Sequence, residues 1–259
     1  MTVALITGAS AGLGAEFAKL FAKDKHDLLL VARRLDRLEA LAKQLQDAHG
    51  IRAHALACDL GVPDGPAQVV AEVQRLGLEI DFLVNNAGFG TSGAFASSDP
   101  AREMEMVQVN IASLVELTRS LIGPMVARKR GRILNMGSTA GFQAGPYMAT
   151  YYASKAFVNL FTEGLAFELR GTGVTATVSC PGATATEFAL VAGNEKSRLF
   201  RMGAASAQTV ALQAYRAMHA GKPMIVHGLK SKLIVQSLRV SPRAMVLKIA
   251  AALNPVPKA

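Results

Sequence analysis

The sequence predicts an α/β protein with a doubly wound, mostly parallel seven-stranded sheet that carries helices on both faces. Short apolar runs alternate with segments of helical spacing, and several runs are apolar almost throughout, as is typical of strands covered on both faces. The 259 residues, 51% of them hydrophobic, can also bury a sizeable core without disulfide or metal support. The predicted strands are Val3–Thr7, Asp27–Ala32, Ala53–Ala57, Phe82–Asn85, Arg132–Met136, Val174–Ser179 and Met224–Val226.

Helical patterns lie between these strands. In Arg34–His49 apolar side chains recur at i, i+3, i+6, i+7 and i+10, counted from Leu35. A second helical pattern covers Ala15–Phe21, and a third opens at Tyr151 and continues through Ala156–Leu169. Such alternation predicts parallel strands joined by crossover helices.

We expect one domain over residues 1–259, because neither a linker-like composition nor a repeat interrupts the chain. Residues 187–205 are less regular, and we expect their apolar side chains to form one wall of a substrate pocket. Residues 229–259 are a basic, apolar C-terminal extension, which Pro242 should divide into two short helices.

The charge is distributed unevenly. Residues 1–195 hold 17 Lys and Arg against 19 Asp and Glu, whereas residues 196–259 hold 11 basic residues and no acidic one. A protein that bound nucleic acid through its whole surface would not confine its excess charge to one end, so we expect no nucleic-acid partner. The five histidines lack metal-ligand spacing, and we expect no metal.

Localisation is inferred from what the sequence lacks. No basic segment precedes the first apolar run, and no window reaches the ~18 uninterrupted apolar residues of a spanning helix. Only Cys58 and Cys180 are present, and both lie beside predicted strands, so we interpret them as buried thiols. We expect a cytoplasmic protein.

A glycine-rich turn follows the first predicted strand and opens a helix: Thr7-Gly8-Ala9-Ser10-Ala11-Gly12-Leu13-Gly14. Glycines allow a tight turn and bring backbone N–H groups close to a pyrophosphate at a helix N-terminus. An ordinary tight turn is the alternative interpretation. The position of the glycine-rich turn after the first strand of an alternating pattern favours dinucleotide binding.

The second predicted strand ends in Val31-Ala32-Arg33-Arg34. In a dinucleotide-binding fold, an acid at this place accepts hydrogen bonds from the ribose 2′-hydroxyl, and a base accommodates a 2′-phosphate. The guanidiniums of Arg33 and Arg34 therefore favour NADP(H), with NAD(H) as the second option. Alternatively, Arg34 only begins an exposed helix.

Tyr151 and Lys155 are four residues apart and should share one face of a helix. A phenol with its ordinary pKa of about 10 is a poor acid or base at neutral pH, and a neighbouring ammonium favours the phenolate. Ser138 follows the strand Arg132–Met136, at the sheet edge where ligands bind. Tyr152 is an alternative only if a lysine three residues away serves equally well.

These motifs, taken in order, resemble the short-chain dehydrogenase/reductase family, in its single-domain branch, over residues 3–227. They are Thr7-Gly8-x-x-x-Gly12-x-Gly14, Cys58-Asp59-Leu60, Asn85-Asn86-Ala87-Gly88, Asn110, Ser138, Tyr151-x-x-x-Lys155 and Pro181-Gly182. The resemblance implies a Rossmann-like fold and hydride transfer between nicotinamide and a carbonyl or secondary alcohol. The expected substrate is apolar: a ketone, a 3-oxoacyl compound or a steroid-like molecule.

The resemblance also implies residue roles. Tyr151 would exchange a proton with the substrate oxygen, Lys155 would lower its pKa and bind the nicotinamide ribose, and Ser138 would polarise the carbonyl. Asn110 would hold a water that links Lys155 to solvent. The implied cofactor-binding residues are Gly8, Ser10, Gly12, Leu13, Gly14, Arg33, Arg34, Asp59, Leu60, Asn86, Ala87, Gly88, Tyr151, Lys155, Pro181, Gly182, Thr184 and Thr186.

Two positions depart from the family's pattern. Ala11 stands where many NADP-using members carry Arg or Lys, which leaves cofactor selectivity to Arg33 and Arg34. Thr184 replaces a common aliphatic residue, and we expect its backbone contact to remain.

Several alternatives stay open at this point. The basic extension can be a subunit contact or a cap on the same molecule, a surface for an anionic membrane, or a lid over the substrate pocket. The family resemblance suggests a homodimer or homotetramer. A dinucleotide-binding redox sensor or scaffold without turnover is the alternative function, although binding alone does not require Asn110, Ser138, Tyr151 and Lys155 together.

Overall fold

The computed structural model describes residues 2–185, 187 and 204–254. Seven parallel strands form one sheet in the order β3-β2-β1-β4-β5-β6-β9. Their bounds are β1 Val3–Thr7, β2 Asp27–Ala32, β3 Ala53–Ala57, β4 Ile80–Asn85, β5 Gly131–Met136, β6 Val174–Cys180 and β9 Met224–Val226. The doubly wound sheet predicted from the sequence is confirmed, with β4, β5 and β6 slightly longer than expected.

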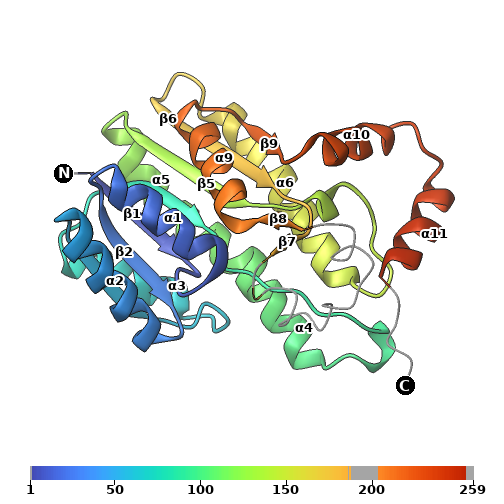
Figure 1. The fold of residues 1–259 in the computed structure, drawn as a ribbon, viewed down its shortest axis with the longest axis horizontal. Helices are drawn as coiled ribbons and strands as arrows, with labels where there is room; N and C mark the ends of the chain where they lie inside the picture. Colours follow the sequence, from blue (N-terminus) through green and yellow to red (C-terminus); the bar gives the residue numbers. More distant parts are fainter. Residues whose placement is uncertain (1, 186, 188–203, 255–259) are drawn as a thin grey trace.

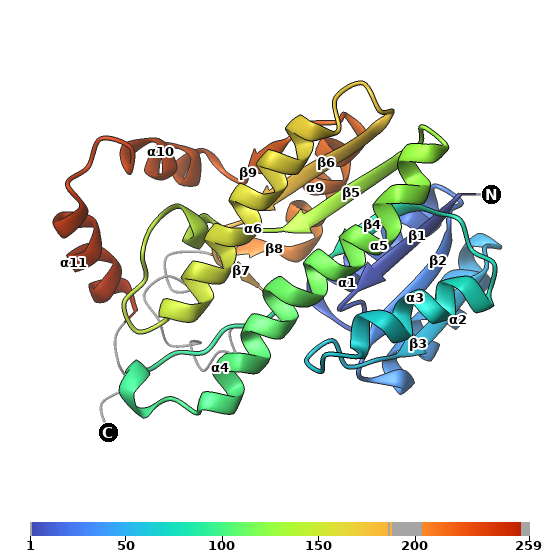
Figure 2. The same ribbon diagram turned by 180° about the vertical axis from the view of Figure 1, so that it is seen from behind.

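Helices cover both faces of the sheet. The helices α1 (Gly12–Lys23), α2 (Leu35–His49) and α9 (Ala207–His219) lie on the face seen in Figure 1. The opposite face, seen in Figure 2, carries α3 (Gly65–Arg75), α5 (Ser113–Ala127) and α6 (Ala149–Glu168). The remaining elements before the last strands are α4 (Pro100–Val107), short helical turns at Phe95–Ser97 and Thr139–Phe142, and a small ladder of β7 (Thr184–Ala185) with β8 (Ala205–Ser206).

The apolar strands contribute side chains to two hydrophobic cores, one on each face of the sheet. Successive side chains of a strand point to opposite faces, so Leu28 and Leu30 of β2 pack against α1 and α9, whereas Leu29 and Val31 pack on the α3–α5 side. All four side chains are fully buried. This two-sided burial is why the strand sequences are apolar almost throughout.

The strand order places the crevice where the site forms. The chain crosses from one side of β1 to the other between β3 and β4, so the loops after β1 and β4 lie side by side at the carboxyl edge. The Asn86 amide joins them by donating to the carbonyls of Thr7 (2.9 Å) and Gly8 (3.2 Å). The Thr7 hydroxyl accepts hydrogen bonds from the N–H groups of Asn86 and Ala87.

After β9 the chain forms two helices, α10 (Leu229–Ser237) and α11 (Arg243–Leu253), separated at Pro242 as the sequence predicts. We call residues 229–254 the C-terminal arm. Figures 1 and 2 place it at one end of the molecule, opposite the end that carries α2. None of the helices in the described residues is long and apolar enough to cross a bilayer.

Candidate active site

The glycine-rich turn between β1 and α1 leaves backbone exposed at the crevice. Gly8 and Gly12 have positive φ of 66° and 55°, which glycine adopts without strain. A Cβ on Gly14 would lie 2.2 Å from the Gly8 carbonyl oxygen, so α1 packs against the turn only because residue 14 lacks a side chain. The N-cap residue Ala11 offers no side-chain acceptor, and the first N–H groups of α1 stay available to an anion. These features fit the pyrophosphate of a dinucleotide.

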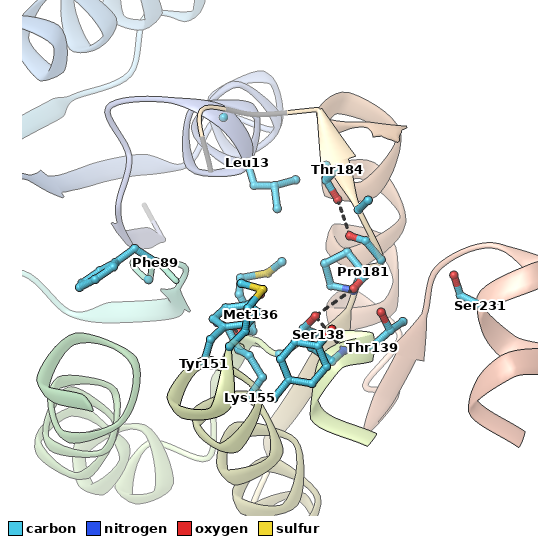
Figure 3. A pocket seen from close by; sticks show the side chains of 18 of the residues that line it. Leu13, Phe89, Met136, Ser138, Thr139, Tyr151, Lys155, Pro181, Thr184 and Ser231 are labelled. Atoms are coloured by element: carbon cyan, nitrogen blue, oxygen red, sulfur yellow. Dashed lines mark hydrogen bonds between the residues drawn. The ribbon is translucent and has the colours of Figure 1, made fainter. Parts of the chain in front are cut away.

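A cavity of about 500 Å³ opens at this edge of the sheet. Its lining comes from the glycine-rich turn, the loop after β4, the end of β5, α6, the Pro181–Thr184 segment and the C-terminal arm. Figure 3 shows Leu13 and Phe89 on one side, Tyr151 and Ser138 at the base, and Ser231 of the arm on the other side. The predicted catalytic residues Ser138, Tyr151 and Lys155 therefore face one space with the glycine-rich turn.

The side chains of Ser138 and Tyr151 both line this cavity, and their interaction lowers the pKa of Tyr151 in part. Ser138 follows β5 in extended conformation; its hydroxyl accepts from the Ala140 N–H (3.0 Å) and lies 3.4 Å from the Pro181 carbonyl oxygen. Asn159 donates to the Ser138 carbonyl at 3.1 Å, which fixes the backbone as well. The hydroxyl is thus held beside the phenol before a substrate arrives.

Lys155 lies one helical turn beyond Tyr151, as predicted. Its ammonium is buried and donates to the Met136 carbonyl at 2.7 Å, 5.9 Å from the centre of the Tyr151 ring. Burial lowers the pKa of Lys155 to about 8.

The pKa of Tyr151 moves against the expectation from the sequence. Burial raises it to about 12, although the hydrogen bond from Ser138 lowers it in part. The expected depression by an ammonium is absent because Lys155 directs its short hydrogen bond to Met136 and not to the phenol. Desolvation therefore dominates in the protein alone.

Asn110 lies in a π-helical turn, Gln108–Ala112, between α4 and α5. Its side chain is buried, exchanges two hydrogen bonds with the backbone of Phe89, and donates to the Ser154 hydroxyl at 3.0 Å. Ser154 in turn donates to the Tyr151 carbonyl at 2.7 Å. Asn110 thereby joins the loop after β4 to the helix that carries Tyr151. Its water-holding role stays a prediction.

The two arginines after β2 diverge. Arg34 donates to the Ser10 hydroxyl through Nε (3.3 Å) and Nη2 (3.1 Å), which brings it to the glycine-rich turn. Arg33 pairs with Glu105 at 3.3 Å instead. That Arg33 and Arg34 bind the 2′-phosphate of the cofactor stays a prediction.

Arg37, which the sequence analysis missed, joins Arg34. Both pair with Glu187, at 2.8 Å and 3.0 Å, and together they hold the pKa of that carboxyl below its usual range. The i, i+3 spacing of Arg34 and Arg37 at the start of α2 is the signal that could have revealed this anion-binding pair.

The other expected cofactor residues divide into two groups. Asn86, Ala87, Gly88, Pro181, Gly182 and Thr184 line the cavity. Asp59 and Leu60 follow β3, where Asp59 accepts from the Gly61 N–H at 2.8 Å and the Leu60 carbonyl accepts from Ser113 at 2.7 Å. Neither belongs to the cavity lining among the described residues. Thr186 and most of the expected loop 187–205 lie outside the described residues.

The contact between the arm and the cavity has no counterpart in the sequence patterns. Asn254, at the end of α11, is buried and donates to the Tyr152 hydroxyl (3.0 Å) and to the Pro146 carbonyl (3.4 Å). Tyr152 is thus engaged with the arm, whereas Tyr151 faces Ser138. No local pattern in the sequence predicts a contact between residues about 100 positions apart.

Comparisons with known proteins agree with this geometry. Residues 2–196 match the protein family described as short chain dehydrogenase. Ketoacyl reductase HetN of Nostoc sp. (strain PCC 7120) is 35% identical over 178 residues, 69% of this chain and 62% of that protein. Sulfoacetaldehyde reductase 2 of Chromohalobacter salexigens is 37% identical over 191 residues, 73% of this chain and 75% of that protein. The structure of a short-chain dehydrogenase from Sphingobium yanoikuyae in complex with NADPH is similar with a TM-score of 0.83 at 31% identity, and the match covers 95% of each chain.

Proposed function

This chain belongs to the short chain dehydrogenase family, a family of oxidoreductases that use nicotinamide dinucleotides, and we propose that it is an NADP(H)-dependent carbonyl reductase or alcohol dehydrogenase with an apolar substrate. One observation carries the proposal. The Ser138 hydroxyl, the Tyr151 phenol and the buried Lys155 ammonium line one cavity together with the glycine-rich turn.

Tyr151 is proposed as the proton donor and acceptor. A bound nicotinamide supplies or accepts the hydride. With a pKa of about 12 the phenol is protonated at neutral pH, which suits donation to a carbonyl oxygen that becomes an alcohol. The reverse direction needs a lower pKa, which the interaction with Ser138 favours.

Ser138, Lys155 and Asn110 would assist that proton transfer. Ser138 would donate a hydrogen bond to the substrate oxygen and hold the carbonyl beside Tyr151. Lys155 would bind the ribose hydroxyls of the cofactor, and Asn110 would hold a water that links Lys155 to solvent. Positioned proton transfer of this type typically contributes roughly 10²–10⁴-fold to the rate.

The preference for NADP(H) is proposed from Arg34, Arg37 and Ser10. Arg34 and Arg37 already bind one anion, the Glu187 carboxylate, and Arg34 also contacts the glycine-rich turn through Ser10. A 2′-phosphate is a stronger acceptor of such paired hydrogen bonds than a hydroxyl. NAD(H) would bind more weakly through the remaining contacts.

Arg34→Leu should raise the Kd for NADPH by about tenfold or more, because a charge-assisted hydrogen bond contributes roughly 1.5–3 kcal/mol, and should change the Kd for NADH much less. Arg33→Leu is the matched control, because Arg33 pairs with Glu105, and it should change both values little. Fluorescence titration with both cofactors measures this. Equal effects of the two substitutions would refute the assignment to Arg34.

An apolar substrate is proposed from the far end of the cavity. Phe89, Met148, Ile234, Leu238 and Leu253 line it. Ketones, 3-oxoacyl compounds and steroid-like molecules suit such a surface. The two curated relatives are named for reductases of chemically different substrates, so identity at this level does not select one of these classes.

An absorbance screen tests the proposed activity. NADPH and NADH oxidation is followed with ketones, aldehydes, 3-oxoacyl esters, quinones and steroids. We expect turnover with NADPH and at least one apolar carbonyl. Tight NADPH binding without oxidation by any of them would favour a dinucleotide-binding sensor or scaffold.

A subunit contact through α6 is proposed as well. The side chains of Leu160 and Phe167 lie two turns apart on this helix and are 69% and 65% exposed. Burial against a second copy would remove them from water. Analytical ultracentrifugation measures the resulting dimer or tetramer.

A further inference from the structure

The first helix of the C-terminal arm is apolar on two opposite faces. Ser231, Ile234 and Leu238 follow one another at i, i+3 and i+7 and line the cavity. Leu229 and Leu233 are one turn apart on the other side of α10, with exposed fractions of 74% and 63%. The first face lines the cavity, with Ile234 56% exposed, and the second has no partner in the described residues.

Exposed apolar side chains also occur in the arm beyond α10. Val240, eleven residues after Leu229 and in the turn that follows the helix, is 86% exposed. On α11, Met245 and Ile249 are one turn apart and are 47% and 53% exposed. We call these five residues the outer face of the arm. Side chains of this size are seldom exposed in such number unless the surface binds something.

Cations surround the outer face. The arm contains five Lys and Arg residues and no acidic residue: Lys230, Lys232, Arg239, Arg243 and Lys248. None of the five forms an ion pair with a described residue, unlike Lys19 and Lys43, which pair with neighbouring carboxylates; the arm also differs from the rest of the chain because it has no acidic residue at all. On a helical projection Lys232 lies beside the Leu229–Leu233 side of α10, Arg239 follows the end of the helix, and Lys230 lines the cavity.

We propose that the outer face of the C-terminal arm docks on the surface of a bilayer that contains anionic phospholipids. Apolar side chains enter the boundary between headgroups and acyl chains, and flanking cations are attracted to anionic headgroups; each interaction strengthens the binding. A second copy of the chain fits less well, because contact between two arms would bring their unpaired cations together.

Docking would also place the cavity beside the lipid. The inner side of α10 lines the cavity while its outer side contacts the bilayer, so the two are one helix diameter apart, about 10 Å. An apolar carbonyl dissolved in the bilayer would then be presented close to Tyr151. This last consequence rests on the proposed function; the docking itself does not.

Vesicle co-sedimentation of the full chain tests the docking. One set of vesicles is phosphatidylcholine alone, and the other contains added phosphatidylglycerol. We expect binding to the anionic vesicles at least tenfold tighter than to neutral ones, and weaker as salt rises. No difference between the two vesicle types, or no binding to either, would overturn the proposal whatever the enzyme assay gives.

Two variants locate the contact. Leu229→Ser with Leu233→Ser should weaken binding at least tenfold, and neutralising Lys232, Arg239 and Lys248 to Gln should have a similar effect. The controls, Val62→Ser with Leu35→Ser and Lys19→Gln with Lys23→Gln and Lys43→Gln, change the same number of exposed residues elsewhere and should bind as the wild type does. Circular dichroism confirms that each variant folds.

The same variants distinguish membrane docking from a contact with a second copy of the chain. If Leu229→Ser with Leu233→Ser converted a dimer into monomers on size exclusion and left vesicle binding intact, the outer face would be a subunit contact and the proposal would be wrong. Unchanged oligomeric state with lost vesicle binding supports it.

Discussion

At the scale of single residues, the cavity holds two titratable groups whose burial opposes their charged forms. Burial raises the pKa of Tyr151 to about 12 and lowers that of Lys155 to about 8. The sequence could predict that these residues share a helical face. It could not predict that Lys155 bonds to the Met136 carbonyl, because that contact depends on how α6 packs against β5. The sign of the Tyr151 shift therefore needed the structure.

Lys155 should make stability depend on pH between about 8 and its unfolded value of 10.5. In this window the unfolded chain holds a proton that the folded protein has released, so the free energy of unfolding rises with pH. Lys155→Met removes the effect. The free energy of unfolding of the variant, relative to that of the wild type, should therefore fall by up to about 3 kcal/mol between pH 7 and pH 10.5, at 1.36 kcal/mol per pKa unit. Urea unfolding at several pH values measures it, and parallel curves would contradict the burial of a charged Lys155.

At the scale of elements, local patterns predicted most of what positions the site. All seven strands and the glycine-rich turn follow from apolar runs, alternation and glycine spacing. The divergence of Arg33 and Arg34 did not follow, because the partners that decide it, Glu105 and Ser10, come from α4 and the first turn. A local sequence pattern does not predict which distant residue an exposed side chain will contact.

Gly14→Ala tests the packing of the glycine-rich turn. Its Cβ would approach the Gly8 carbonyl oxygen to 2.2 Å, so the turn and α1 must move apart. We expect a loss of about 1–3 kcal/mol in stability, as for other overpacked sites, and a tenfold or greater rise in the Kd for NADPH.

Gly123→Ala is the control for that substitution. Gly123 is also helical, in α5, but a Cβ there meets no heavy atom within 4 Å, so alanine should be neutral or stabilise by up to about 1 kcal/mol. Urea unfolding and NADPH titration compare the two variants. If both behaved alike, close packing at Gly14 would not be what holds the turn.

At the scale of the whole molecule, the C-terminal arm completes a cavity that the sheet begins. The sequence analysis predicted the break at Pro242 and kept cap, membrane surface and lid open as roles for the arm. The structure favours a combination of cap and lid, because the inner side of α10 lines the cavity and Asn254, at the end of α11, donates a hydrogen bond to Tyr152. Only the folded chain shows that the arm turns back on α6.

Asn254→Ala should loosen the end of the arm. It leaves the buried Tyr152 hydroxyl without its amide donor, at a cost of about 1–3 kcal/mol. We expect the KM for a bulky apolar ketone to rise several-fold to tenfold or more, with little change for a small aldehyde and a smaller change in kcat. Gln236→Ala, at an exposed position of α10, is the control. Equal effects on both substrates would show that the arm does not form the substrate wall.

The most direct test of the proposed chemistry replaces Tyr151 by Phe and measures NADPH binding and carbonyl reduction on the same preparation. We predict that the Kd for NADPH stays within about threefold, while kcat falls by about 10³-fold or more, in the range that a positioned proton donor contributes. Tyr152→Phe, whose hydroxyl faces Asn254, should keep most of the activity. A Tyr151→Phe enzyme that still reduced the substrate at close to the wild-type rate would contradict the assignment of Tyr151 as the acid.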